Sequence, residues 1–204
     1  LESYDGKPIK TIAANPEVVF TGNWGVDLVN LIKQSRAMGM KAPFICYYLN
    51  DPLVVMPVVQ EAAIGSWFCE AYALSVRTPA NKDLLERWSA KKKFVDLQKW
   101  PFGSMGKAYN GTKFLLAAIK KAGTLDIPTI IKTFEGMRWE GVTGPMIMRA
   151  EDHQVMMPLP VAEIVKTTNE FYPFPYVGEP TMLPMEKTTV PLAETGCTRK
   201  AGQM

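Results

Sequence analysis

The sequence predicts an α/β protein with a parallel sheet, and two observations carry this prediction. A β-branched and aromatic run at 18–21 is followed by an amphipathic segment at 26–38 and a second apolar run at 44–49. Strand, helix and strand with short connections form a right-handed βαβ crossover, in which the two strands are parallel. The composition, 47% hydrophobic and 21% charged, is typical of a globular protein.

Each element of this unit has its own signal. The helix is predicted over 26–38, because apolar residues recur with helical spacing and Gly39 is a typical residue just past a helix end. The strand at 44–49 ends at the turn signal Asn-Asp-Pro of 50–52. A third apolar run covers 65–76, after a short helical stretch. The first part of the chain is therefore α/β.

Helices dominate the next part. An amphipathic helix follows 78–83. Its apolar face is formed by Leu84, Leu85 and Trp88. A longer helix is predicted over about 104–122, with Gly123 as its stop, and a shorter one begins at Asp126 and ends at Gly136.

The last part changes pattern again. The segment 141–165 contains two apolar strands around the polar turn 151–154, which predicts an antiparallel hairpin. From Tyr172 the chain is rich in proline and weakly periodic, so we expect an extended tail packed on a surface. The glycosylation triplet at Asn110 falls inside a predicted helix and is discounted.

Charge, hydropathy and cysteines exclude several classes. A formal charge of +3 is too small to indicate nucleic-acid binding, and the basic run 91–93 is interpreted as a solvated helix face. No stretch approaches the roughly 20 apolar residues that a membrane helix needs. The cysteines lack a metal-like spacing, and Cys46 and Cys69 are expected to be buried thiols.

The loop 22–25 resembles a phosphate-binding loop only superficially. It lies at the carboxyl end of a predicted strand, where open α/β sheets bind ligands. Its glycine spacing does not match the dinucleotide pattern, and Trp24 would block close approach of a phosphate. Two interpretations of Trp24 remain: it offers a flat face to an apolar or aromatic ligand, or it caps the core.

A second set of candidate residues follows the next strand, at Tyr47, Tyr48, Asn50 and Asp51. Successive strand residues face opposite ways, so one tyrosine should point toward the crevice beside Trp24 and the other into the packing.

Catalysis and metal binding have little support. His153 is the one histidine, and Asp152 should point away from its ring on an extended strand. Consecutive residues such as 151–153 do not converge easily on one ion. We therefore predict a turn residue at His153, and no catalytic residue, metal or cofactor.

Three segments together resemble one protein family. They are "NPEVVFTGNWGVDLVNLIKQSRAMGMKAPF", "AYNGTKFLLAAIKKAGTLD" and "GPMIMRAEDHQVMMPLPVAEIV", and with their spacing they cover most of 10–166. Their order is similar to the carboxyl-terminal portion of the branched-chain amino acid (Leu/Ile/Val-binding) type of ABC-transporter substrate-binding protein. The resemblance implies a type I periplasmic-binding-protein fold, with two three-layer αβα lobes that close on a ligand around a hinge.

This resemblance also implies a domain division and partners. The ranges 1–75 and 76–157 correspond to parts of the second and first lobes, and 158–204 to the second-lobe return with its tail, with hinge crossings near 72–79 and 155–160. The opening units of the first lobe and the first strand of the second are lacking, so a fragment is expected, with the missing amino-terminal part as a partner. The other partners are a small-molecule ligand and an ABC permease, at a periplasmic or extracellular location with a lipid anchor as an option.

The same register assigns the ligand-binding residues. Trp24 matches an aromatic residue that lines the family's cleft, and Tyr48 stands where amino-acid-binding members carry an acid for the ligand's ammonium. Because Tyr48 makes no such ion pair, the resemblance points to a carboxylate without an amine or to an amide, with an amino-acid-like compound still open. Asn23 and Asp51 are polar supplements. Two alternatives remain: a hydrolase or amidase-like enzyme on an α/β scaffold that uses His153, and a ligand sensor of the same fold.

Overall fold

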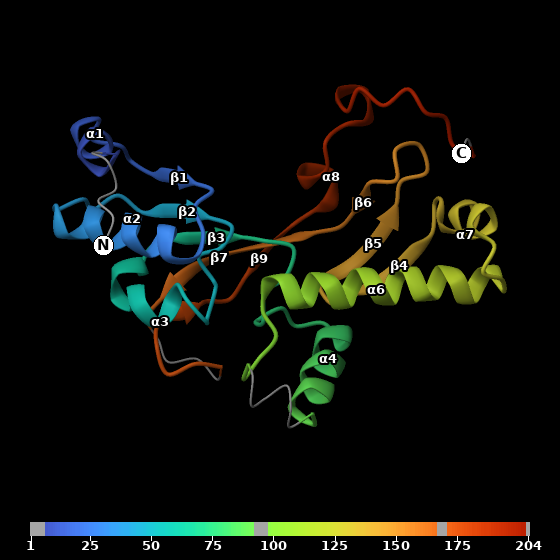
Figure 1. The fold of residues 1–204 in the computed structure, drawn as a ribbon, viewed down its shortest axis with the longest axis horizontal. Helices are drawn as coiled ribbons and strands as arrows, with labels where there is room; N and C mark the ends of the chain where they lie inside the picture. Colours follow the sequence, from blue (N-terminus) through green and yellow to red (C-terminus); the bar gives the residue numbers. More distant parts are fainter. Residues whose placement is uncertain (1–6, 92–97, 167–170, 203–204) are drawn as a thin grey trace.

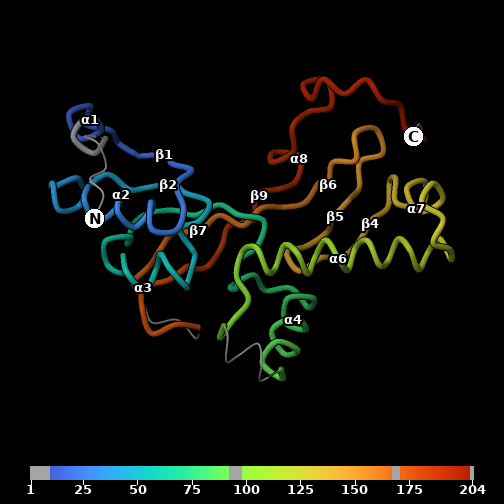
Figure 2. Tube along the Cα trace, viewed as in Figure 1, coloured from blue at the N-terminus to red at the C-terminus, as the bar shows by residue number. Residues whose placement is uncertain are grey.

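The computed structural model describes residues 7–91, 98–166 and 171–202, and it separates into two groups of secondary structure (Figure 1). One group is built on a six-stranded sheet and the other on a three-stranded sheet. Extended connections join the two groups (Figure 2). None of the helices in the described parts is long and apolar enough to span a membrane.

The six-stranded sheet confirms the predicted parallel core. Strands β1 (Val19–Thr21), β2 (Phe44–Cys46) and β3 (Trp67–Cys69) run parallel in this order. Strand β7 (Leu159–Val165) lies antiparallel beside β3. Strands β8 (Tyr176–Val177) and β9 (Thr181–Leu183) both pair with β7.

Helices α1 (Lys7–Ala13), α2 (Gly25–Ala37) and α3 (Met56–Val59) and the 3₁₀ turn η1 (Gln60–Ala63) belong to this group. As predicted, α2 ends just before a glycine, since Gly39 has the left-handed φ of 87°. Its apolar stripe is buried with the sheet residues in one core. The fully buried members of that core include Leu28, Ile32, Phe44 and Phe68.

The predicted strand at 44–49 is too long. The strand β2 ends at Cys46, and 47–50 forms a turn in which the Asp51 N–H donates to the Tyr48 carbonyl at 3.2 Å. Apolar content alone predicted the longer strand. The turn predicted from residues 50–52 begins already at residue 47.

The second group holds α4 (Pro79–Ser89), α6 (Gly103–Ala122) and α7 (Ile127–Phe134), and the strands β4 (Arg138–Gly141), β5 (Gly144–Met148) and β6 (Val155–Met156). The stop of α6 is confirmed, because Gly123 is its C-cap with φ 68°. Helix α4 begins earlier than predicted, with Thr78 as N-cap. Strand β4 was not predicted. The basic run 91–93 lies mostly outside the described residues.

The predicted hairpin over 141–165 is only half right. Strands β5 and β6 do pair antiparallel around the polar turn. The second apolar run then leaves this sheet, because β7 pairs with β3, β8 and β9 in the other group. The chain therefore crosses between the groups at 157–158.

The predicted surface tail from Tyr172 is also partly wrong. The rings of Tyr172 and Tyr176 are only 8% and 2% exposed and lie 4.8 Å apart in the core of the first group. After β9, the short helices α8 (Met185–Thr188) and η2 (Leu192–Glu194) carry the chain to the second group. There Arg199 pairs with Glu135, just after α7. Among the described residues, the chain that follows β9 is therefore a third connection between the groups, besides those that follow β3 and β6.

Candidate functional site

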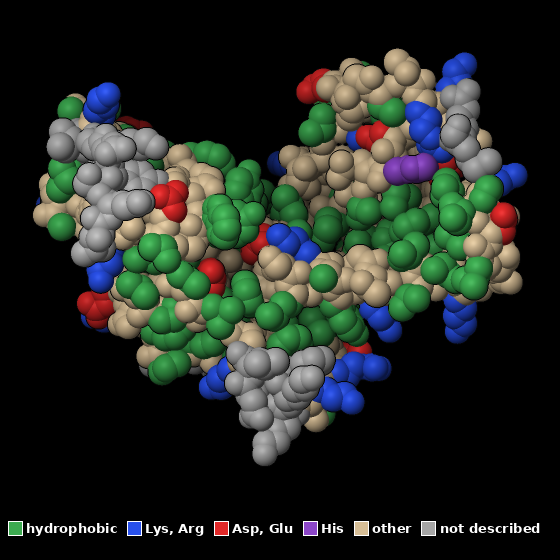
Figure 3. Space-filling view, viewed as in Figure 1, with side chains coloured by type: hydrophobic (Ala, Val, Ile, Leu, Met, Phe, Trp, Pro, Cys, Tyr) green, Lys and Arg blue, Asp and Glu red, His purple; other side chains and the backbone are tan. Residues whose placement is uncertain are grey.

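The candidate site is the carboxyl edge of β1, β2 and β3, which faces the second group (Figure 1). Ligands of open parallel sheets bind outside the carboxyl ends of the strands. The space-filling view shows a hollow between the two groups, bordered by the loop that follows β1 (Figures 1 and 3). The side chains at this edge are therefore the candidates for contact with a ligand.

Trp24 is the largest exposed side chain of this edge. It follows β1, precedes the first residue of α2, and is 70% exposed. Gly25 beside it has a φ of 56°, so the loop turns there in the left-handed region that glycine adopts without cost. The structure contradicts the interpretation of Trp24 as a cap on the core, since the ring faces solvent.

Asn23, predicted as a polar supplement, is engaged in holding this loop. The Thr21 hydroxyl donates to its side-chain oxygen, and its amide nitrogen donates to the Asp27 carboxylate. The backbone carbonyl of Asn23 also accepts from Cys46 Sγ at 3.2 Å, which ties the loop to β2. Asn23 therefore holds the conformation of the loop that carries Trp24.

Both tyrosines after β2 are exposed, at 45% for Tyr47 and 40% for Tyr48. The prediction that one of them would point into the packing is wrong, because the residues lie in a turn and not on an extended strand. The Tyr47 ring meets the Phe20 ring edge-on, with centroids 5.9 Å apart. This edge of the sheet therefore presents several aromatic surfaces to solvent.

Asp51 acts locally in this structure. Its Oδ1 atom accepts from the backbone N–H groups of Leu53 at 2.7 Å and Val54 at 3.2 Å. The carboxylate thus holds the turn that follows β2. Its prediction as a ligand-binding residue has no direct support from these contacts.

The sequence reasoning missed a third strand end, at Glu70. This residue follows β3, is only 6% exposed, and its Oε1 atom lies 2.6 Å from Nζ of Lys107 on α6. Burial raises the pKa of Glu70, and the hydrogen bonds and charge of Lys107 oppose that rise. The third apolar run was predicted over 65–76, so Glu70 lay inside it and not at its end. Its charge, the one charge in that run, was the signal that could have revealed the end of β3.

Two glycines allow α6 to approach this edge. A Cβ atom on Gly103 would lie 2.0 Å from Glu70 Oε2, and one on Gly106 would lie 2.1 Å from Cγ of Tyr72. Both distances are far below contact, so a side chain at Gly106 would overlap the buried Tyr72 ring, and one at Gly103 would require the Glu70 carboxylate to move. The start of α6 is thereby packed directly on the end of β3 and the chain that follows it.

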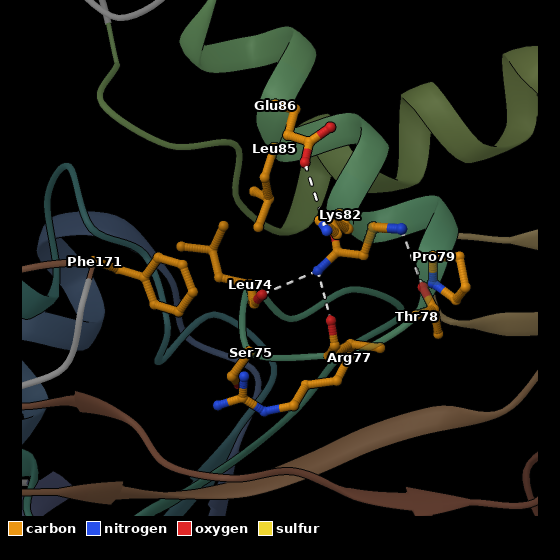
Figure 4. A pocket seen from close by; sticks show the side chains of 11 residues that line it. Leu74, Ser75, Arg77, Thr78, Pro79, Lys82, Leu85, Glu86 and Phe171 are labelled. Atoms are coloured by element: carbon orange, nitrogen blue, oxygen red, sulfur yellow. Dashed lines mark hydrogen bonds and ion pairs between the residues drawn. The ribbon is translucent and has the colours of Figure 1, made fainter.

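A separate pocket of about 630 Å³ lies beside the connection from β3 to α4 (Figure 4). Asn81 stabilises this connection, because its side-chain nitrogen donates to the carbonyls of Leu74 at 3.0 Å and Val76 at 2.7 Å. The Tyr72 hydroxyl donates to the same side chain at 2.9 Å. Leu85 and Phe171 form apolar walls. Trp24 and Tyr48 do not line this pocket.

His153 has a structural contact and no catalytic arrangement. Its Nε2 atom lies 3.0 Å from Glu135 Oε1, while Asp152 pairs with Arg149 at 2.5 Å instead of orienting the ring. The Arg199 guanidinium and then His153 lower the pKa of Glu135 to about 2. Within the described ranges, no group of three acidic, histidine or cysteine side chains could hold a metal ion.

The structure also shows how far the predicted thiols and the glycosylation triplet are buried. Cys46 is buried as predicted, whereas Cys69 is half-buried, and burial raises the pKa of both thiols. Asn110 is buried within α6, and its side-chain oxygen accepts from the Val142 N–H at 3.0 Å. An amide held in this way is not a sugar acceptor.

Comparison with known sequences gives a family and several relatives. Residues 8–169 match the family described as periplasmic binding protein. The chain is 27% identical to Leu/Ile/Val-binding protein homolog 4 of Brucella melitensis over 197 residues, which is 88% of this chain and 45% of that protein. The homolog in Brucella abortus gives the same values. The chain therefore spans about half the length of the curated relatives that it matches.

Solved structures share the fold. The closed form of the leucine-, isoleucine-, valine-, threonine- and alanine-binding protein of Brucella ovis superposes with a TM-score of 0.79 at 23% identity, over 98% of this chain and 51% of that one. A solute-binding protein of Rhodopseudomonas palustris, solved with 3,4-dihydroxybenzoic acid, gives 0.66 at 17% identity, over 92% and 51%. The type I periplasmic-binding-protein fold expected from the sequence is thus confirmed, and since the family match covers most of the chain, the protein belongs to the periplasmic binding protein family.

Proposed function

We propose that the chain is part of a solute-binding protein that holds a small molecule between two lobes and delivers it to an ABC-type uptake permease. The observation that carries this proposal is the exposure of Trp24 and Tyr48 at the carboxyl edge of a parallel sheet that faces a second structural group. Exposed aromatic rings bring no packing energy to the fold. Such rings contribute apolar contact energy when a ligand covers them.

The ligand class follows from these side chains. Trp24 and Tyr48 offer flat apolar faces and a hydroxyl, and neither supplies a negative charge for an ammonium group. The relatives include a protein named for leucine and other amino acids and one solved with 3,4-dihydroxybenzoic acid. We propose a small carboxylate, amide or amino-acid-like compound as the ligand.

Closure around a hinge would complete the site. We propose that the division expected from the sequence, 1–75 with 158–204 against 76–157, holds as far as β9, and that the chain after β9, whose Arg199 pairs with Glu135, moves with 76–157. The two bodies would then turn about the connections that follow β3, β6 and β9. In support of this division, β1–β3 and β7–β9 share one sheet, and β4–β6 form the other. Closure would exclude water from the hollow and bring the start of α6 toward the ligand.

A further proposed partner is an amino-terminal part of the same polypeptide, since this chain spans about half the length of its curated relatives. β1 is an edge strand, with Phe20 on it 66% exposed. Leu116 on α6 and Leu125 near α7 are also exposed, at 54% and 80%. We propose that the half of the relatives' length that has no counterpart in this chain covers these surfaces and supplies further ligand contacts.

The proposed location is the periplasm or the cell exterior, either free or held by a lipid anchor, beside a permease. An enzymatic role for His153 gains no support, because its ring is paired with Glu135. A His153→Asn variant of the full-length protein is therefore expected to bind its ligand with unchanged affinity.

The first test is a ligand screen by thermal shift on the full-length protein, with small carboxylates, their amides and amino acids. We expect at least one class to raise the unfolding midpoint, since a ligand that binds only the folded state stabilises it. If no compound at millimolar concentration raises the midpoint, the proposed function is wrong.

A further inference from the structure

An ion pair joins the two groups at the base of the proposed cleft. Glu70 follows β3 in the first group, and Lys107 lies in the second turn of α6 in the second. Their charged atoms are 2.6 Å apart. The start of α6 lies beside the chain that leaves β3, between the two groups (Figure 1).

The two partners differ sharply in exposure. The Glu70 side chain is 6% exposed, whereas the Lys107 side chain is 39% exposed. The carboxylate therefore faces the protein, packed against Gly103, while the ammonium keeps an open side. A lysine ammonium carries three N–H donors, and one of them suffices for the contact with Glu70.

This pair is connected to the aromatic edge. Asn50, buried in the turn after β2, donates a side-chain hydrogen bond to Glu70. The same turn carries Tyr48, whose carbonyl accepts from the Asp51 N–H. Burial raises the pKa of Glu70, and the negative charge of Asp51, which repels that of Glu70, adds to this rise. The Oδ1 atom of Asp51 accepts hydrogen bonds from two backbone N–H groups of its own turn. The turn thus places the ion pair and the exposed tyrosine on one edge of the sheet.

We propose that Lys107 is a specificity-determining residue that binds an anionic group of the ligand, a carboxylate, and that Glu70 positions its ammonium. The inference rests on the proposed binding function. It assigns to Lys107 the positive charge for the ligand's carboxylate, which Trp24 and Tyr48 do not supply. A lysine free in solvent loses side-chain entropy when it binds a ligand. A buried carboxylate that already holds the chain reduces this cost, which is the general advantage of preorganisation.

The alternative role of the pair is structural, as a link between the two groups. Removal of Lys107 alone would leave Glu70 buried without its partner and would destabilise the protein. The informative variant is therefore the double substitution Glu70→Gln with Lys107→Met, which removes both charges at nearly constant volume. A purely structural pair would leave the choice between a carboxylate and its amide unchanged.

The experiment is a calorimetric titration of the full-length protein with two matched pairs of probes. These are 4-hydroxybenzoate with 4-hydroxybenzamide, and 4-methylpentanoate with 4-methylpentanamide. We expect the wild type to prefer a carboxylate over its amide. In the double variant the affinity for the carboxylate should fall about 10- to 100-fold, the effect of losing a hydrogen bond to a charged group. The affinity for the amide should change less than about threefold.

Two single variants serve as controls. Glu70→Gln keeps the ammonium but removes the carboxylate that positions it, so the affinity for the carboxylate should fall about threefold while the preference over the amide remains. Far-UV circular dichroism accompanies each titration to show that every variant is folded. Lys120→Met removes an exposed charge from the last turn of the same helix and should change neither affinity. Loss of the preference in the double variant alone supports the inference.

Two results would overturn the inference. A wild type that binds carboxylate and amide equally has no anion-specific group, and a carboxylate preference that survives in the folded double variant places that group elsewhere. In both cases the binding function itself stands. If no probe of either pair binds, and the wider screen also fails, the proposed function falls and this inference falls with it.

Discussion

The carboxyl ends of β1 and β3 lie on the same edge of one sheet, yet they present opposite chemistry. After β1 the chain exposes a large apolar side chain, Trp24, at 70%. After β3 it buries a charged one, Glu70, at 6%. The packing of α6 on the end of β3 explains the buried charge, because Lys107 compensates it. No packing in the described residues requires the exposed ring, which points to a ligand.

The largest effect is expected where α6 meets the β3 end. In the full-length protein, Gly106→Ala should lower the free energy of unfolding by about 3 kcal/mol, because its Cβ would overlap the buried Tyr72 ring. Gly111→Ala is the matched control on the same helix, since nothing lies within 4 Å of its added Cβ. It should raise the free energy by about 0.5–1 kcal/mol. Urea denaturation measures both; equal effects would show that the close approach is absent.

A second prediction uses pH to separate two buried or partly buried glutamates. Burial raises the pKa of Glu70 from 4.5, so the folded state binds its proton more tightly than the unfolded state does. Its contribution to the free energy of unfolding is therefore present at low pH and declines as the pH rises above 4.5. Glu70→Gln should remove this decline.

Glu135 should show the opposite sign. Its pKa falls from 4.5 to about 2, so its contribution is present above 4.5 and is lost as the pH falls toward 2. Glu135→Gln should flatten this acid limb, as measured by urea denaturation across the same pH series. If both variants shift the curve in the same direction, the assigned environments are wrong.

The smallest effect on stability is expected at the β1 end. Because the Trp24 ring is mostly exposed, Trp24→Ala should change the free energy of unfolding by less than about 0.5 kcal/mol. Thermal denaturation without ligand provides the measurement. A loss of more than about 2 kcal/mol would mean that the ring packs on the core of the full-length protein after all.

The sequence predicted the parts of the fold that depend on local patterns. The apolar spacing of α2 and the stop at Gly123 were visible, as was the parallel order of β1 and β2. The pairing of β7 was not, because an apolar run does not state which sheet it joins. Tyr172 and Tyr176 were missed for a related reason: prolines around them hide core residues that long-range contacts bury.

For the candidate site, the sequence predicted that Trp24 and Tyr48 follow neighbouring strands, but not which residues surround them. Strand ends are readable from the chain, whereas the partner of a strand end depends on how distant segments pack. Glu70 and Lys107 are far apart in sequence, and the small residues Gly103 and Gly106 that bring them together had no local signal. Asn23 and Asp51 were selected by position, and the structure shows that both stabilise their own loops.

The central claim is that the exposed aromatic edge binds a ligand, and the most direct test is a titration of full-length Trp24→Ala with the compound that the thermal screen identifies. Trp67→Ala is the matched control, because that tryptophan is 38% exposed and lies at the opposite, amino end of β3. We predict at least about a tenfold loss of affinity for Trp24→Ala, as expected when an aromatic anchor is truncated, and no more than about a twofold change for Trp67→Ala. Equal affinities for wild type and a folded Trp24→Ala variant would contradict the account.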